Sequence, residues 1–170
     1  MKRISCLVFV CSCLATSNIG QGVRSPKFTA YPAPVEKAKA KQIDFRHSPG
    51  AGTVRTRLRE AMAEGVDFAG HYKIAGWGCG TGCISGAVID MRTGRVYFPE
   101  ELYALSVGYF SGDYESEPLK YKKNSRMLIL SGIPGQADDN KPQKPWGDYY
   151  YEWRNNGFRQ LKYVKRDNPK

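Results

Sequence analysis

Residues 77–83, which read Trp-Gly-Cys-Gly-Thr-Gly-Cys, constrain the fold of this chain more than any other stretch. The glycines allow backbone conformations that other residues adopt only with strain. Cys79 and Cys83 are close enough in sequence to fold back on each other and form a disulfide. Because strand-like segments lie on both sides, the sequence predicts a disulfide-closed loop at the end of a β-hairpin.

The first residues have the pattern of a secretory signal peptide. Lys2 and Arg3 supply a basic start, residues 4–14 are mostly apolar, and residues 15–17 are small. We therefore expect residues 1–17 to be removed and the protein to be secreted or periplasmic. A second way of processing is also possible, because residues 10–13 loosely resemble a bacterial lipobox. If they act as one, Cys13 would be lipidated and would anchor the protein to a membrane.

Signal removal changes the cysteine count. Cys6, Cys11 and Cys13 lie in the predicted signal, so Cys79 and Cys83 are the pair that remains after cleavage. An even number of cysteines in an oxidising compartment favours a disulfide between them. A redox site normally has a two-residue spacer, and a metal site needs more ligands than two thiolates. We therefore predict no metal and no other cofactor.

The chain is strongly basic. Its formal net charge of +10 falls to +8 if the signal, with Lys2 and Arg3, is removed. Such a surface keeps a protein soluble and favours anionic partners, here an envelope protein or an anionic cell-wall component. No basic block contains interleaved aromatic residues, so no specific nucleic-acid partner is expected. Membrane contact is expected only if Cys13 is lipidated, and the oligomeric state is left open.

The remainder divides into three parts. Residues 18–52 form an extended leader rich in proline and lysine, which could tether the domain or lie across it, with Ile43 and Phe45 as a short edge strand. Residues 53–165 form a single α+β domain, and residues 166–170 form a tail.

The domain is expected to begin with a helix at residues 53–64, which has Thr53 as its N-cap and Gly65 as its left-handed stop. A second, short helix is predicted at residues 101–107. Strands are predicted at 68–77, 84–91, 95–99, 126–131, 148–153 and 158–164. The predicted fold class is α+β, with one N-terminal helix packed on a twisted, mainly antiparallel sheet of about six strands.

The closing hairpin, with a predicted turn at Asn156-Gly157, is rich in aromatic residues. Tyr149, Tyr151 and Trp153 share one face of its first strand, and Tyr150 lies on the other. A sheet with one buried face can take only one of these sets inward. The rings therefore either form an exposed binding surface or pack beneath the helix and leader.

No catalytic constellation is evident. A nucleophile elbow needs glycine two residues before and after the nucleophile, and neither Cys79 nor Cys83 has this spacing. His71 could pair with Cys83 or with Asp90, which makes His71 and Asp90 a candidate polar site, although a histidine within a strand is more often structural. A later loop carries residue types that can bind a cation, but without regular ligand spacing: Asp138, Asp139 and Asn140.

Residues 68–72 (Phe-Ala-Gly-His-Tyr), 77–83, 89–90 (Ile-Asp) and 93–94 (Thr-Gly) together resemble a pattern in small uncharacterised secreted bacterial proteins. The resemblance implies a location in the bacterial envelope. It implies no activity and no mechanism.

The stapled loop, the surplus of aromatic rings and the missing catalytic constellation favour a non-enzymatic binding protein, such as an inhibitor or immunity-type partner of an envelope enzyme. The loop would be the contact surface, and its residues are Trp77, Gly78, Gly80, Thr81 and Gly82. The alternative is an envelope enzyme, either a hydrolase or a thiol-dependent enzyme, that uses His71 with Cys83 or Asp90.

Overall fold

One α-helix and two antiparallel sheets of four strands each make up the part of the chain that this computed structural model describes, residues 25–107, 117–135 and 142–167. The first sheet contains β1 (Tyr72–Gly80), β2 (Cys83–Asp90), β3 (Val96–Tyr97) and β4 (Leu105–Ser106). The second contains β5 (Leu119–Tyr121), β6 (Met127–Gly132), β7 (Gly147–Arg154) and β8 (Gly157–Lys165). The helix is α1 (Arg55–Ala63), and short 3₁₀ turns are η1 (Phe28–Ala30), η2 (Phe45–His47), η3 (Ala51–Val54) and η4 (Glu100–Leu102).

The prediction of one helix on a single sheet of about six strands is therefore wrong. The strands divide into two sheets, because β1–β4 pair among themselves and β5–β8 pair among themselves. Hairpin pairing is indicated by turn residues that are local in sequence. Whether two such meanders join edge to edge or pack face to face depends on contacts between residues far apart in the chain, and here they pack face to face.

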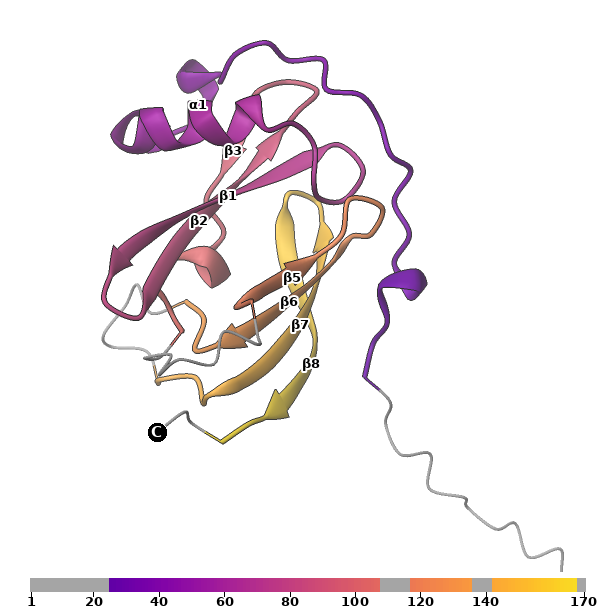
Figure 1. The fold of residues 1–170 in the computed structure, drawn as a ribbon, viewed down its shortest axis with the longest axis vertical. Helices are drawn as coiled ribbons and strands as arrows, with labels where there is room; N and C mark the ends of the chain where they lie inside the picture. The colour runs from indigo at the N-terminus through magenta and orange to yellow at the C-terminus, as the bar shows by residue number, and fades with distance from the viewer. Residues whose placement is uncertain (1–24, 108–116, 136–141, 168–170) are drawn as a thin grey trace, which may run out of the picture.

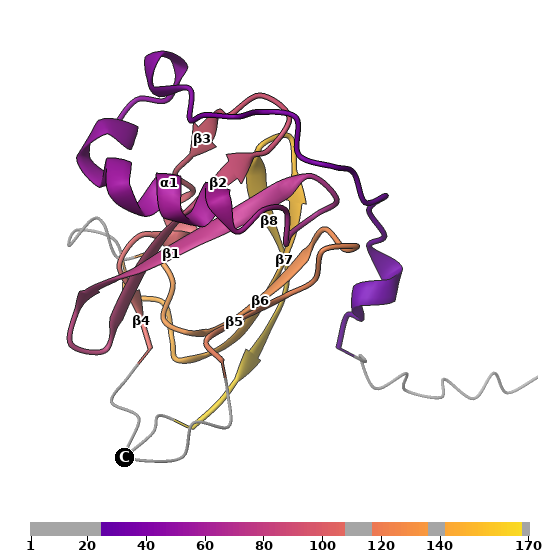
Figure 2. The same ribbon diagram turned by 45° about the horizontal axis from the view of Figure 1, so that its top comes forward.

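The two sheets face each other (Figure 2), and the inner hydrophobic core lies between them. Ile74 of β1 and Val88 of β2 meet the aromatic residues of β7, namely Tyr149, Tyr151 and Trp153, none of which is more than 2% exposed. Burying side chains of this size stabilises the fold by about 2–3 kcal/mol each. This face of the closing hairpin is therefore core and not a binding surface.

The opposite face of the first sheet is covered by α1 (Figure 1). Leu58 and Ala61 of the helix pack in an outer core with Ala87 and Ile89 of β2. Because β2 is covered on both faces, residues 85–90 are all buried. A strand in this position needs no alternation of apolar and polar residues, and β2 shows none.

The helix begins later than predicted. Thr53 lies in η3, and its hydroxyl donates a hydrogen bond to the carbonyl of Gly50 (2.8 Å) instead of capping a helix. The helix α1 starts at Arg55 and has no side-chain cap. After its end, Gly65 adopts the predicted left-handed conformation, with φ of 85°.

Two other local predictions are corrected. Residues 101–107 contribute to η4 and β4 and do not form a helix. The last hairpin turns at Asn155 and Asn156, one residue earlier than predicted, because Arg154 pairs with Gly157. Both asparagines have positive φ (52° and 60°), which a type I′ hairpin turn requires and which asparagine tolerates better than most residues.

Residues 32–44, here called the strap, lie across the domain (Figure 1). Strap amides donate to domain carbonyls at 2.8–2.9 Å: Ala33 to Asn124, Glu36 to Gly70 and Asp44 to Gly94. Ile43 is 4% exposed and packs in the outer core. Ile43 and Phe45 do not form the expected edge strand, because Phe45 begins the 3₁₀ turn η2.

Two glycines allow the strap to come this close. Gly70 and Gly94 both have left-handed backbones, with φ of 84° and 80°. A Cβ atom at Gly70 would overlap the carbonyl oxygen of Pro34, and one at Gly94 would overlap that of Gln42. Both positions therefore need glycine for conformation and for space.

We expect Gly70→Ala to destabilise the protein more than Gly65→Ala. The two glycines have nearly the same φ (84° and 85°), so each substitution carries a backbone cost of about 1–2 kcal/mol. Only Gly70 lies against the strap, where overlap with Pro34 adds roughly 1–3 kcal/mol. Urea denaturation of the two variants measures the difference in unfolding free energy. Equal losses would show that the strap does not lie against Gly70.

Candidate functional site

The end of the β1–β2 hairpin contains the predicted disulfide between Cys79 and Cys83. The ladder is irregular just before its last pair, Gly80 with Cys83, so Cys79 is an extra residue in a β-bulge. A bulge changes the direction of the side chain that it contains, and here the Cα atoms of the two cysteines lie 5.2 Å apart. Thr81 and Gly82 form the turn.

This hairpin end is anchored to the rest of the domain. The strand β4 pairs with the start of β2, so that Cys83 lies opposite Ser106. The amide of Val107 also donates a hydrogen bond to the carbonyl of Gly82 (2.8 Å). Leu105, in β4, is fully buried in the inner core. The turn is therefore held as an edge of the domain.

We expect loss of the disulfide to lower the free energy of unfolding modestly without unfolding the domain. The cysteines are four positions apart, and closing so short a loop contributes about 2 kcal/mol. In a chain with serine in place of Cys6, Cys11 and Cys13, thiol titration should find no free thiol. The further double variant Cys79→Ser/Cys83→Ser should keep its circular dichroism spectrum but unfold at a lower urea concentration. Two reactive thiols, or an unfolded double variant, would contradict this expectation.

Beside the hairpin end lies a groove of about 390 Å³, here called the Trp77 groove. Three segments line it: residues 49–54 before α1, the β1–β2 hairpin, and residues 98–103 after β3. Most of its apolar lining comes from proline, valine and aromatic side chains: Pro49, Val54, Trp77, Phe98, Pro99 and Tyr103.

Aromatic rings stand at different depths in this groove. Trp77 lies opposite Ser85 in the hairpin and is half-buried, because part of its ring packs against the outer core. Phe98 and Tyr103 stand further out, with 41% and 55% of their surfaces exposed. Exposed rings around a concave apolar surface are typical of sites that bind a partner.

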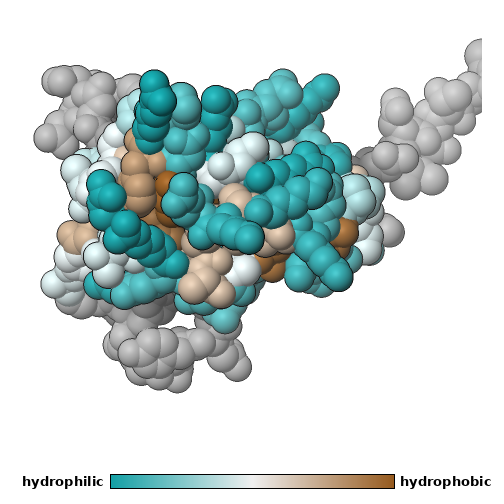
Figure 3. Space-filling view, turned by 90° about the horizontal axis from the view of Figure 1, so that it is seen from above, coloured by the Kyte–Doolittle hydropathy of each residue, from teal (hydrophilic) through white to brown (hydrophobic). Residues whose placement is uncertain are grey.

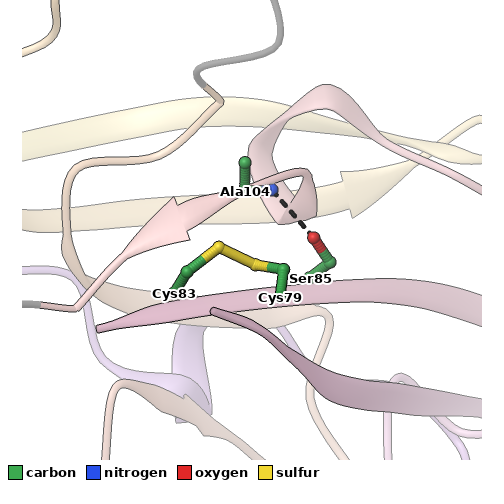
Figure 4. Close-up of a disulfide and its surroundings, with 4 residues drawn as sticks. All are labelled: Cys79, Cys83, Ser85 and Ala104. Atoms are coloured by element: carbon green, nitrogen blue, oxygen red, sulfur yellow. Dashed lines mark hydrogen bonds between the residues drawn. A yellow bond between two sulfur atoms is a disulfide. The ribbon is translucent and has the colours of Figure 1, made fainter. Parts of the chain in front are cut away.

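The residue after Tyr103 has an uncommon backbone conformation that a hydrogen bond fixes. Ala104 has a left-handed φ of 48°, which is uncommon for any residue that carries a Cβ. Its amide donates a hydrogen bond to the hydroxyl oxygen of the buried Ser85 (3.0 Å), beside the disulfide (Figure 4). Strained backbone that the surrounding structure holds in place is common at ligand sites.

Of the loop residues predicted as contacts, Trp77 lines the groove. Gly78, Gly80 and Thr81 are exposed at the hairpin tip, and Gly82 is half-buried. The sequence prediction missed Phe98 and the other side chains of residues 49–54 and 98–103, because these segments meet Trp77 only in the folded chain. The sequence did contain one local indication for Phe98. It is followed by Pro99, and a proline indicates that the strand ends there and that Phe98 lies at the start of a connecting segment.

The second predicted pair, His71 and Asp90, does come together. The register of the hairpin pairs Tyr72 with Asp90, and His71 Nε2 lies 3.9 Å from Asp90 Oδ1. Next to His71 is a cavity of about 310 Å³. Its wall includes Glu36 from the strap and Arg92, which form an ion pair.

Asp90 has a structural role in this arrangement. Its carboxylate accepts hydrogen bonds from the amide of Arg92 (2.8 Å) and the hydroxyl of Thr93 (2.9 Å), which stabilise the turn into β3. Cys83, the alternative partner of His71, lies at the other end of β2, and its sulfur is in the disulfide. The structure therefore brings together His71 with Asp90 and not His71 with Cys83.

Burial lowers the pKa of His71 below 6.5, and the charge of Arg92 adds to this effect, while Asp90 and Glu36 oppose it. The folded state then binds fewer protons than the unfolded chain. The unfolding free energy should therefore fall as the pH decreases from about 6.5 through the folded pKa, and then level off. NMR titration of the ring in buffer and in urea measures both pKa values. A folded pKa at or above the unfolded one would contradict this prediction.

A buried lysine beneath α1 is paired. Lys73 Nζ lies 2.6 Å from a carboxylate oxygen of Glu64 and 2.7 Å from one of Asp67. Burial disfavours the charge on Lys73, but the hydrogen bonds that its ammonium group donates to the two carboxylates outweigh burial and raise its pKa. Asp67 also accepts hydrogen bonds from the hydroxyl of Tyr121 and the amide of Ile74. This cluster serves stability, because its polar groups satisfy one another.

Within the described ranges, no three His, Cys, Asp or Glu side chains are grouped so that they could hold a metal ion. The same ranges contain no helix that is long and apolar enough to cross a bilayer. The predicted signal at residues 1–17, with Cys13, lies outside the described residues, as do Asp138, Asp139 and Asn140.

Comparisons with protein-family models, with curated proteins and with solved structures find no match. Function is therefore inferred from the geometry of the Trp77 groove and of the cavity beside His71.

Proposed function

We propose that this chain is a non-enzymatic binding protein, secreted or periplasmic, that holds an envelope protein in the Trp77 groove. An inhibitor or an immunity-type partner of an envelope enzyme would work in this way. The observation that supports the proposal best is the exposure of Phe98 and Tyr103 around a concave surface that has Trp77 at its base.

These rings can contribute a useful binding energy. About half of each of Phe98 and Tyr103 is exposed, which corresponds to roughly 100 Å² per ring. Covering that surface contributes about 2–3 kcal/mol per ring. Aromatic anchors of this size in a preformed pocket are typical hot spots of protein interfaces.

The rigidity of the groove favours binding over a passive role. The disulfide, the β4 pairing and the Ser85–Ala104 hydrogen bond hold its walls before any partner arrives. A preformed site loses less conformational entropy on binding than a flexible one. The disulfide also supports an oxidising compartment, in agreement with the signal expected at residues 1–17.

The alternative is an envelope enzyme that uses His71 with Asp90. The 3.9 Å separation of these residues beside a cavity supports it. It is the weaker proposal, because the Asp90 carboxylate is engaged by Arg92 and Thr93, and because the disulfide withholds Cys83 as a thiol.

The binding proposal predicts that the groove rings carry the affinity. A photo-crosslinking residue in place of Tyr103 should trap a partner in the cell envelope, which is then identified, purified and titrated. Phe98→Ala and Tyr103→Ala should each weaken that complex about thirtyfold or more. Trp77→Ala should weaken it too, and its unfolding curve must be checked because Trp77 also packs in the outer core.

The matched control is Val35→Ala. Val35 is 51% exposed, like Tyr103, but it lies on the strap and does not line the groove. Its replacement should leave the affinity unchanged. The proposal fails if no partner is trapped at Tyr103, or if Val35→Ala weakens the complex as much as the groove variants do.

A further inference from the structure

A second, larger groove lies where the strap meets α1. Its volume is about 810 Å³, and its lining comes from residues 40–46, residues 55–63 and Thr93. Four basic residues line it, Lys41, Arg46, Arg55 and Arg59, together with one acidic residue, Asp44. We call it the basic groove. Figure 3 looks onto the side of the molecule that carries α1, and hydrophilic residues cover most of that side.

The positive charge of the basic groove is not neutralised. Among the ion pairs of the described residues, none involves Lys41, Arg46, Arg55 or Arg59. The carboxylate of Asp44 lies 2.8 Å from His47 Nδ1 and accepts a hydrogen bond from the His47 amide. Asp44 is therefore engaged, while the basic side chains remain available to a ligand.

Two arginines are held together in an unfavourable arrangement. Arg55 and Arg59 are four residues apart on α1, where like charges destabilise a helix. Arg55 also begins the helix, whose N-terminal turn has no acidic residue and disfavours a cation. Both guanidinium groups nevertheless lie over the ring of Phe45, at 4.1 Å and 5.7 Å from its centroid. An anion between them would relieve this repulsion.

The shape and chemistry of the groove select among anions. A flat bilayer would meet only its rim, whereas a soluble molecule can enter it, and 810 Å³ is within the usual size of ligand pockets. A phosphate group presents several acceptor oxygens and up to two negative charges, so it can engage more than one guanidinium fork at a time. Ile43, Phe45 and Met62 supply an apolar part of the lining for the rest of the ligand.

We infer that the basic groove binds a soluble phosphorylated compound with more than one negative charge. Arg55 and Arg59 hold the phosphate, and Lys41 and Arg46 add further positive charge from the strap side. This site is separate from the Trp77 groove, so the inference stands or falls independently of the proposed partner.

The test is calorimetric titration of the full chain with sodium tripolyphosphate. Binding should weaken about tenfold or more in Arg55→Gln and in Arg59→Gln, each made alone. Arg57→Gln is the matched control, because Arg57 is on the same helix, does not line the groove and lies 3.6 Å from Glu60. Circular dichroism checks that all variants are folded. Backbone NMR shifts of the unmodified chain, which need no variant, should be confined to residues 40–46, residues 55–63 and the neighbourhood of Thr93.

Three outcomes would overturn the inference. The first is the absence of tripolyphosphate binding, and the second is an equal loss in Arg57→Gln, which would mean that only the diffuse surface charge acts. The third is co-sedimentation with phosphatidylglycerol vesicles that tripolyphosphate does not compete away, which would assign the face to a membrane. NMR shifts spread over the whole surface would likewise mean that only the diffuse surface charge attracts tripolyphosphate.

Discussion

The burial of both faces of β2 is the constraint on which the rest of the structure depends. One face of this strand packs against the second sheet and the other packs against α1, so the first sheet is the middle of three layers. Residues 49–54, which lead into α1, therefore reach the β1–β2 hairpin. Because β4 pairs with the start of β2, the segment before β4 reaches the same hairpin. These two segments and the hairpin line the Trp77 groove.

Left-handed backbone occurs in two different settings in this protein. Gly70 and Gly94 have left-handed backbones that let the strap lie against the domain, and both serve packing. Ala104 has a similar backbone without the freedom of glycine, and it lies beside an exposed tyrosine and a disulfide. Ala69 also has a positive φ (43°) but is buried in the inner core, whereas Ala104 follows the exposed Tyr103 in the chain.

Charge follows a similar division. Carboxylates near the interior accept hydrogen bonds from neighbouring cations, Asp67 from Lys73 and Glu152 from Arg159. The hydrogen bond from Arg159 lowers the pKa of Glu152 more than burial raises it. Several surface cations have no such partner, above all Arg55 and Arg59 in the basic groove. The described part of the chain therefore carries its unpaired charge mainly as exposed cations, which attract anions.

The sequence by itself determined the features that depend on neighbours in the chain. These are the Cys79–Cys83 hairpin end, the left-handed Gly65 and the shared face of the β7 aromatic residues, because turn chemistry and strand alternation are local. Only the tertiary structure decided that there are two sheets, that the aromatic face is core, and that Phe98 and Tyr103 surround Trp77. Those outcomes depend on contacts between segments far apart in the chain, whose free energies no local pattern records.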